Sequence, residues 1–139
     1  MTKITREELK EFVPHREPML LVDEVDINPD GTVTACYQIK GDEPFLSGHF
    51  PGNPIVPGVI LCEIMAQSCT MLVKEHIKGK VTLFSGMDNV RFKQIVRPGD
   101  VCQVEARLVN SRGMIFFCQA VLSVGGKLCC KGDLSFALV

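Results

Sequence analysis

Residues 48–67 read GHFPGNPIVPGVILCEIMAQ, and the character of the sequence changes near the middle of this stretch. The first half contains prolines, which fix φ and lack an amide hydrogen, and glycines, which permit backbone angles that other residues avoid. We therefore expect a stiff loop with one shape. From Gly58 to Lys78 there is no proline and no further glycine, and apolar residues occur on every side. This pattern predicts one long helix that is buried nearly all round.

Two ionisable residues stand out in this stretch. His49 precedes the prolines, and Glu63 lies in the second turn of the expected helix among apolar neighbours. Burying a carboxylate costs several kcal/mol unless it is paired, hydrogen-bonded or protonated, although a helix N-terminus favours negative charge by about 0.3–1 kcal/mol. Gln67, one turn on, shares the face of Glu63. Two interpretations remain open: a partly exposed polar stripe, or a chemical site formed with His49.

The length and charge of the chain limit the classes of protein to which it can belong. Its 139 residues are enough for one domain with its own core, so we expect a single domain over residues 1–139. A net charge of −1 argues against a general nucleic-acid binder. No uncharged apolar run reaches the length of a membrane span, and the N-terminus lacks the apolar core of a secretory signal. We expect a cytoplasmic protein that binds neither nucleic acid nor membrane.

The sequence contains seven cysteines, which is an odd number. None forms a Cys-x-x-Cys pair, and no histidine lies at the spacing of a zinc site. Because most of them occupy apolar positions and no export signal is present, we expect reduced thiols that act as small core residues. No metal site is predicted.

Capping and turn signals divide the rest of the chain into short elements. Thr5 and Glu8 form a capping box for a helix that ends near Phe12. Extended segments are expected over residues 19–27, 32–40, 81–96, 101–109, 114–124 and 127–138, with turns at 28–31, 97–100, 110–113 and 125–126. A helix of 21 residues is about 31 Å long, and strands of nine to eleven residues span about 30–36 Å. We therefore expect an α+β domain in which a curved antiparallel sheet wraps one long central helix.

The central stretch carries a long, gapless motif, which reads His49-Phe50-Pro51-Gly52-x-Pro54-Ile55-x-Pro57-Gly58-Val59-x-x-x-Glu63-x-Met65-Ala66-Gln67. This motif resembles the signature of the FabZ-type (3R)-hydroxyacyl-acyl-carrier-protein dehydratases, which are hot-dog-fold enzymes of type II fatty acid synthesis. The resemblance extends from about Pro14 to Val139. It includes the segment 15–18, where the family usually has an aromatic residue in place of Glu17. It implies the hot-dog fold and conversion of a (3R)-hydroxyacyl thioester into the trans-2-enoyl thioester.

Dehydration of a β-hydroxy thioester needs a base for the α-proton, an acid for the departing hydroxyl and a donor for the carbonyl oxygen. His49 suits the base because histidine titrates near neutral pH. Glu63 suits the acid because burial favours a neutral carboxyl group. The backbone amide of Gly58, at the start of the helix, suits the donor. The resemblance implies the same three roles, and the reaction requires no metal and no cofactor.

The resemblance also implies partners. It implies a homodimer whose active sites combine His49 of one subunit with Glu63 of the other, and commonly a homohexamer built as a trimer of dimers. It implies that the substrate arrives on the acidic acyl carrier protein. Arg91, Lys93 and Arg97 fall on one face of an extended segment and are candidates for docking this carrier. A solvated strand face is the alternative interpretation.

Several further residues are candidates for contact with the substrate. We expect Phe50, Val59 and Gln67 to contact it. The acyl chain also needs an apolar tunnel, and its candidate lining, which includes Ile64 and Phe84, has core packing as the default role. His15 and His76 are expected to be structural or exposed, without a catalytic part.

Three rival functions share the expected fold. A bifunctional FabA-type dehydratase-isomerase would carry Asp where Glu63 stands, so Glu63 favours dehydration without isomerisation. A hot-dog thioesterase would lack the His-Phe-Pro-Gly run. A non-catalytic acyl-thioester-binding protein would bind the thioester without turnover, and the presence of both His49 and Glu63 argues against it.

Overall fold

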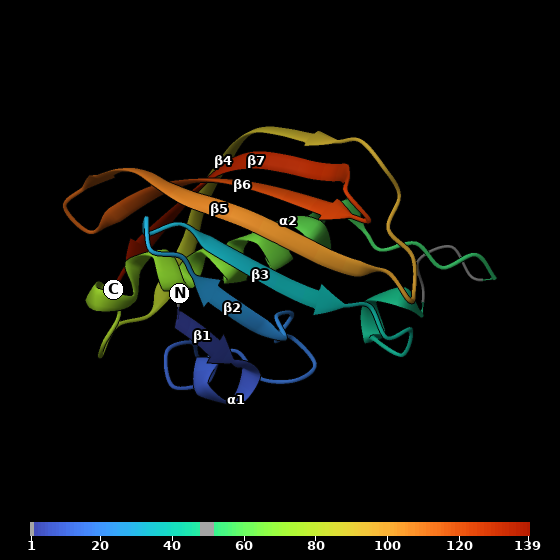
Figure 1. Cartoon of the computed structure of the whole chain (residues 1–139), viewed down its shortest axis with the longest axis horizontal. Coiled ribbons are helices and arrows are strands. Elements are labelled where there is room, and N and C mark those ends of the chain that lie inside the picture. The colour runs from blue at the N-terminus through green and yellow to red at the C-terminus, as the bar shows by residue number, and fades with distance from the viewer. Residues whose placement is uncertain (1, 48–51) are drawn as a thin grey trace.

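One antiparallel sheet dominates the computed structural model, which describes residues 2–47 and 52–139. Within these residues seven strands pair in the order β1-β2-β3-β5-β6-β7-β4. The elements in chain order are β1 (Thr2–Thr5), α1 (Arg6–Leu9), β2 (Glu24–Ile27), β3 (Val33–Gln38), the 3-10 helix η1 (Pro44–Leu46), α2 (Gly58–Ser68), the 3-10 segment η2 (Cys69–His76), β4 (Thr82–Phe92), β5 (Val101–Arg112), β6 (Ile115–Val124) and β7 (Lys127–Leu138). The long strands lie over α2 (Figure 1), so the predicted α+β architecture is confirmed.

The long strands β5 and β6 bury alternate side chains against α2. The buried residues are Cys102, Val104 and Ala106 of β5, and Phe116, Cys118, Ala120 and Leu122 of β6. Leu108 and Met114 continue the same alternation in the sequence, but both are exposed. Leu108 lies beside a register shift between β5 and β6, and Met114 lies in the turn before β6. The Gly125-Gly126 hairpin is as predicted, with the positive φ angles of +58° and +82° that a tight two-residue turn requires.

The central helix is shorter than predicted. α2 has 11 residues, and the chain then continues as η2, which has non-helical angles at Val73 (φ −116°, ψ 25°). The Ser68 hydroxyl donates a 2.7 Å hydrogen bond to the Ile64 carbonyl, and such a bond to the preceding turn bends helices. Two β-branched residues, Thr70 and Val73, further disfavour the α-helix. α2 is therefore about 16 Å long. The 3-10 segment η2 extends the central helical segment further, at about 2.0 Å per residue.

The strand predicted over residues 19–27 is also shorter, because two side chains bind the backbone of residues 19–22. Arg6 donates 2.7 Å hydrogen bonds to two carbonyls of this segment. The Gln67 side chain binds one of its amides and one of its carbonyls, also at 2.7 Å. These backbone groups are then unavailable for pairing with a strand. The strand β2 consequently begins only at Glu24.

Other boundaries differ by a few residues. The capping box at Thr5 and Glu8 is confirmed, but α1 ends at Leu9 rather than near Phe12. β1, which was not predicted, pairs with β2. β4 ends at Phe92, four residues before the predicted end of the extended segment, whereas β5 continues to Arg112 through a predicted turn.

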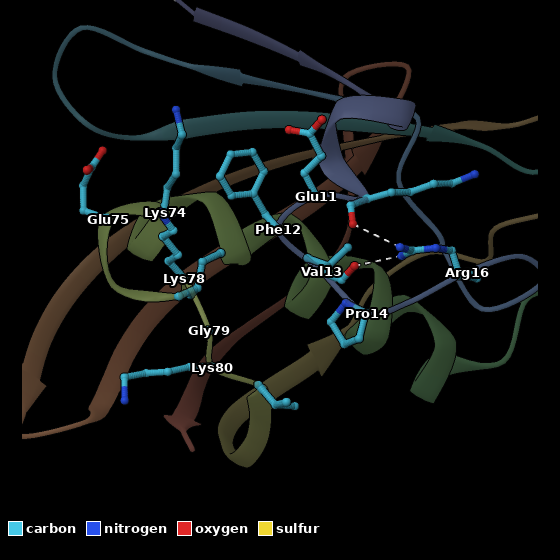
Figure 2. Close-up of a pocket in the computed structure, with 13 residues that line it drawn as sticks. Glu11, Phe12, Val13, Pro14, Arg16, Lys74, Glu75, Lys78, Gly79 and Lys80 are labelled. Atoms are coloured by element: carbon cyan, nitrogen blue, oxygen red, sulfur yellow. Dashed lines mark hydrogen bonds between the residues drawn. The ribbon is translucent and has the colours of Figure 1, made fainter.

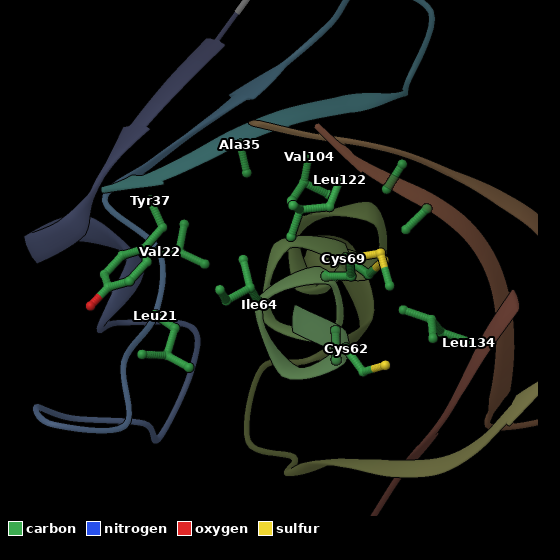
Figure 3. Close-up of a cluster of buried hydrophobic side chains, with 14 of the residues drawn as sticks. Leu21, Val22, Ala35, Tyr37, Cys62, Ile64, Cys69, Val104, Leu122 and Leu134 are labelled. Atoms are coloured by element: carbon green, nitrogen blue, oxygen red, sulfur yellow. The ribbon is translucent and has the colours of Figure 1, made fainter. Parts of the chain in front are cut away.

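The core lies between α2, η2 and the concave face of the sheet (Figure 3). Cys69 lies on the side of the helical segment that faces Leu134 of the sheet, and Ile64 lies on the side that faces Val22 (Figure 3). All seven cysteines are free, and all except Cys36 are buried, which agrees with their predicted role as small apolar core residues. Among the described residues, no helix is long and apolar enough to span a membrane.

Candidate active site

Glu63 projects from the second turn of α2 into a small pocket of about 90 Å³. The lining consists of Val13, Pro14, His15, Glu63, Ala66, Gln67, Thr70, Thr82 and Phe84. The Glu63 side chain is 26% exposed. Its Oε2 atom accepts a 2.9 Å hydrogen bond from Nε2 of Gln67, and lies 3.5 Å from Nε2 of His15. The predicted acid is therefore hydrogen-bonded to Gln67, lies near His15 and remains partly exposed.

Gln67 lies beneath this carboxylate and is 2% exposed. Its Oε1 atom accepts a hydrogen bond from the Leu21 amide, and its Nε2 atom donates to the Met19 carbonyl and to Glu63. The oxygen and both amide hydrogens are thus engaged by the protein. The contact of Gln67 with the substrate stays a prediction, whereas its contact with Glu63 is present in the structure.

His15 lines this pocket, although it was predicted to have no catalytic part. It follows α1 in a segment without regular structure, and its Nδ1 atom is buried without a hydrogen-bond partner in the described part of the chain. The distance between His15 and Glu63 in the sequence predicts no contact, because Glu63 lies on α2 and His15 does not. The match of the segment 15–18 to the family pattern was the one signal that could have pointed to it.

His49 and Phe50 lie outside the described residues. The chain that leads toward them is described as far as Ser47, and Glu43 fixes it. The Glu43 carboxylate accepts hydrogen bonds from the Tyr37 hydroxyl at 2.6 Å and from the Gly41 amide at 2.7 Å. Burial alone would raise the pKa of Glu43, but these donors outweigh it and lower the pKa. Glu43 is therefore a buried anion that holds this loop against β3.

The N-terminus of α2 carries the predicted carbonyl donor. The amides of Ile60 and Leu61 both donate to the Pro57 carbonyl, whereas the Gly58 amide has no acceptor among the residues that the structure describes. The ring of Phe92 lies directly over Gly58, and a β-carbon at Gly58 would stand 2.8 Å from its Cε1 atom. The first turn of α2 thus offers a free N–H group beside an aromatic ring. No pattern in the sequence predicts that Phe92 lies here.

Val59, the next residue, is 66% exposed, so its side chain is available for the substrate contact that was predicted.

The candidate docking residues Arg91, Lys93 and Arg97 are also exposed. The extended segment on which they were predicted to share one face is interrupted. A register shift precedes Arg91, β4 ends one residue before Lys93, and Arg97 begins a turn closed by its amide hydrogen bond to Asp100.

A larger groove of about 560 Å³ adjoins the Glu63 pocket and shares Val13 and Pro14 with it. Figure 2 shows that its charged side chains point in different directions. The Arg16 guanidinium is bound to the backbone carbonyls of Lys10 and Val13, and the Lys74 ammonium lies 5.4 Å from the centre of the Phe12 ring. These groups do not converge on a ligand. The smaller pocket at Glu63 is therefore the better candidate for chemistry.

Comparisons with known proteins identify the family to which the chain belongs. A family profile described as FabA-like domain matches residues 13–133. The 3-hydroxyacyl-acyl-carrier-protein dehydratase FabZ of Clostridium perfringens is 44% identical over 133 residues, which are 94% of this chain and 96% of that protein. The proteins of the same name from Caldicellulosiruptor bescii and Bacillus subtilis are 42% and 39% identical, each over 95% of this chain and 96% of the relative.

Solved structures share the fold. The dehydratase heterocomplex ApeI:P from Xenorhabdus doucetiae matches with a TM-score of 0.80 at 22% identity, over 94% of this chain and 90% of that chain. A hypothetical thioesterase with coenzyme A from Streptococcus pneumoniae matches with a TM-score of 0.62 at 14% identity, over 83% and 84%. The predicted hot-dog fold is confirmed. The sequence identity over nearly the whole chain shows that the protein belongs to the FabZ-type 3-hydroxyacyl-acyl-carrier-protein dehydratases, within the family of FabA-like domains.

Proposed function

We propose that the protein removes water from (3R)-3-hydroxyacyl chains carried by acyl carrier protein and forms the trans-2-enoyl thioester in fatty acid biosynthesis. The observation that carries this proposal is the 44% identity to a dehydratase over 94% of the chain. The site geometry supports it, because the partly buried carboxyl group of Glu63 and the free amide at the N-terminus of α2 are two of the three groups that the reaction needs.

In the proposed mechanism His49 takes the proton from the α-carbon of the thioester. The Gly58 amide donates to the carbonyl oxygen on which negative charge develops. Neutral Glu63 gives its proton to the β-hydroxyl, the bond between the β-carbon and oxygen breaks, and water leaves as the double bond forms. The step ends with a proton on His49 and a negative charge on Glu63. Transfer of one proton back to Glu63 restores the enzyme.

We further propose a homodimer in which His49 and Glu63 of one active site come from different subunits, and assembly of dimers into a homohexamer. Support comes from β4, which is the last strand of the sheet. This strand and the residues flanking it expose large apolar side chains, namely Val81, Leu83, Phe84, Met87, Phe92 and Ile95. An uncovered edge strand with apolar side chains promotes association. A second copy of the chain would cover it.

The carrier protein and the cellular location complete the proposal. We assign the docking of the acidic carrier to Arg91, Lys93 and Arg97, which are exposed and lie on the same segment as Phe92, the residue whose ring contacts Gly58 at the start of α2. We place the protein in the cytoplasm, where the carrier-bound intermediates of type II fatty acid synthesis are processed.

Absorbance of the conjugated enoyl thioester tests the function directly. Wild-type protein should interconvert crotonyl and 3-hydroxybutyryl thioesters, and the His49→Ala and Glu63→Ala variants should lose nearly all of this activity. Equal activity in either variant and the wild type would remove that residue from the mechanism. A wild-type protein that is inert on short and long thioesters would refute the dehydratase function.

A further inference from the structure

The two carboxylate oxygens of Glu63 have different surroundings. Oε2 accepts the 2.9 Å hydrogen bond from Gln67 and lies 3.5 Å from the ring of His15. Oε1 has no hydrogen-bond partner within residues 2–47 and 52–139. The Glu63 side chain is 26% exposed, so the oxygen without a partner, Oε1, remains available to a ligand.

The orientation of the Gln67 amide is fixed by its backbone partners. The Leu21 amide can only donate, so the Gln67 atom beside it must be the carbonyl oxygen. The Met19 carbonyl can only accept, so the atom beside it must be the amide nitrogen. The second hydrogen of this nitrogen then points at Oε2 of Glu63. Gln67 is therefore a donor to the carboxyl group, and a flipped amide would lose all three hydrogen bonds.

The position of His15 favours a second donor to the same oxygen. Its Nδ1 atom is buried without a partner in the described part of the chain, and a hydrogen there would be left unpaired at an energetic cost. The neutral tautomer with its hydrogen on Nε2 leaves only a lone pair on Nδ1, and it gives the ring nitrogen that lies 3.5 Å from Oε2 a donor, where the other tautomer would face the carboxylate with a second acceptor.

We propose that His15 and Gln67 are positioning residues that hold Oε2 of Glu63 as an acceptor and thereby leave Oε1 to carry the acidic proton. This inference rests on the proposed function, because it assigns one oxygen to the acid role of Glu63. With Oε2 accepting from Gln67 and facing Nε2 of His15 at 3.5 Å, the proton of the neutral carboxyl group belongs on Oε1, the oxygen open to the substrate hydroxyl. After that proton leaves, the same two donors stabilise the carboxylate that forms.

The backbone around His15 is tied to its surroundings. Arg16 donates hydrogen bonds to the carbonyls of Val13 and His15, at 2.9 and 2.7 Å. Glu17 forms ion pairs with Arg6 at 3.0 Å and with Lys10 at 3.2 Å. The imidazole is thus mounted on a segment that is fixed next to α1 and, through Gln67, next to α2.

Steady-state kinetics of His15 variants test the proposal with 3-hydroxybutyryl-coenzyme A as substrate. His15→Phe keeps a flat ring but has no donor, and should lower kcat by roughly 10- to 100-fold with little change in KM. His15→Gln can place an amide N–H where Nε2 stands, and should recover most of the lost kcat. His76→Phe and His76→Gln serve as matched controls, since His76 is exposed and stacks on Phe116 away from the pocket, and both should resemble the wild type.

A Gln67→Glu variant tests the second donor. It keeps an acceptor for the Leu21 amide but replaces the amide donor by a second carboxyl group, which cannot ionise together with Glu63 at this distance, so kcat should fall at least as far as in His15→Phe. If this variant does not fold, as judged by circular dichroism, the pair of His15 variants decides. Wild-type kcat in His15→Phe, or equal losses in His15→Phe and His15→Gln, would overturn the proposal. An inert wild type would instead refute the proposed function, so the two failures are distinguishable.

Nitrogen-15 NMR gives a readout that does not depend on turnover. The proposal expects His15 as the neutral tautomer with its hydrogen on Nε2 at neutral pH. Glu63→Ala should weaken this preference, because the acceptor of the Nε2 hydrogen is lost. A hydrogen found on Nδ1 in the wild type would contradict the assignment.

Discussion

Phe92 lies so close to Gly58 that a β-carbon on Gly58 would stand 2.8 Å from the Cε1 atom of the aromatic ring. The ring is 55% exposed, so it can swing toward solvent if it is pushed. Gly58 therefore provides more than a flexible link between the loop and α2. Its missing side chain makes room for a ring over the first free amide of the helix.

This contact makes a prediction for Gly58→Ala. The added methyl should displace the ring, and replacing glycine at a compatible helical position stabilises a protein by about 0.4–1 kcal/mol. The two effects oppose each other, so the free energy of unfolding should stay within about 1 kcal/mol of the wild type while kcat/KM falls. In a Phe92→Ala background the same change should be stabilising, because no ring is displaced. A double-mutant cycle by urea unfolding measures the coupling, and a coupling of zero would contradict the contact.

Glu17, which replaces the aromatic residue usual in the family, predicts a dependence of stability on pH. Its own backbone amide, Arg6 and Lys10 lower the pKa of Glu17 from 4.5 to about 2. A group with a lowered pKa in the folded state stabilises the protein above its unfolded pKa, and this contribution is lost as the pH falls through the folded value. Glu17→Gln should therefore be less stable than the wild type near pH 7.

The stability difference caused by Glu17→Gln should shrink as the pH falls from about 5 to about 2. Urea unfolding midpoints measured over this range for both proteins give the test. Glu11→Gln is a suitable control, because Glu11 is exposed and forms no ion pair in the described part of the chain. A difference that stays constant from pH 7 to pH 2 would show that Glu17 acts through something other than its charge.

Mixing two inactive variants tests the shared active site. In a hybrid of His49→Ala and Glu63→Ala subunits, one of the two sites combines an intact His49 with an intact Glu63. Equal amounts with free exchange should restore about one quarter of the wild-type activity, since half of the dimers are hybrids with one working site each. Subunit exchange is verified with differently tagged chains. Exchange without rescue would place His49 and Glu63 of each site in the same subunit.

Much of the fold could be predicted because it depends on local patterns. The capping box at Thr5, the Gly125-Gly126 hairpin and the alternation of β5 and β6 each follow from neighbouring residues. The segment 19–22 could not be predicted as irregular, because its backbone groups are bound by Arg6 and Gln67 from distant positions. The apolar pattern there is that of a buried strand. Long-range side-chain hydrogen bonds decided the outcome.

The candidate site, too, could be predicted only where the signal is local in the sequence. Glu63 was identifiable because a carboxyl group in an apolar helix is locally anomalous. His15 and Phe92 were not, since the first approaches Glu63 and the second approaches Gly58 only in the folded protein. The interruption of the segment that carries Arg91, Lys93 and Arg97 could not be predicted for a related reason. The register shift and the end of β4 depend on pairing with β7.

The docking proposal predicts a separation of two kinetic effects in Arg91→Glu. Reversing one exposed charge should weaken association with an acidic carrier protein far more than turnover of a free coenzyme A thioester, because the free thioester makes no contact with a docking surface. Rates with carrier-bound and coenzyme A-bound 3-hydroxybutyryl groups, measured at low and high salt, give the comparison. Lys127→Glu provides a control charge reversal at the start of β7. Equal effects of Arg91→Glu on both substrates would contradict docking at this residue.

Tyr37 and Glu43 predict a stability effect at the loop that precedes His49. The Tyr37 hydroxyl donates a 2.6 Å hydrogen bond to Glu43, and both side chains are buried. A hydrogen bond to a charged group contributes about 1.5–3 kcal/mol, so Tyr37→Phe should lower the free energy of unfolding by about that amount. Urea unfolding at pH 7 measures it.

The same pair of residues predicts that the protein loses stability at high pH. Burial, and then the Glu43 carboxylate, raise the pKa of Tyr37 above its ordinary value of 10.0. A group with a raised pKa stabilises the folded protein fully below its unfolded value, and the contribution is lost as the pH rises toward the folded value. The wild type should therefore lose stability above pH 10 more steeply than Tyr37→Phe, so the two unfolding curves converge. Parallel curves from pH 7 to pH 12 would show that Tyr37 ionises as easily in the folded protein as in the unfolded chain.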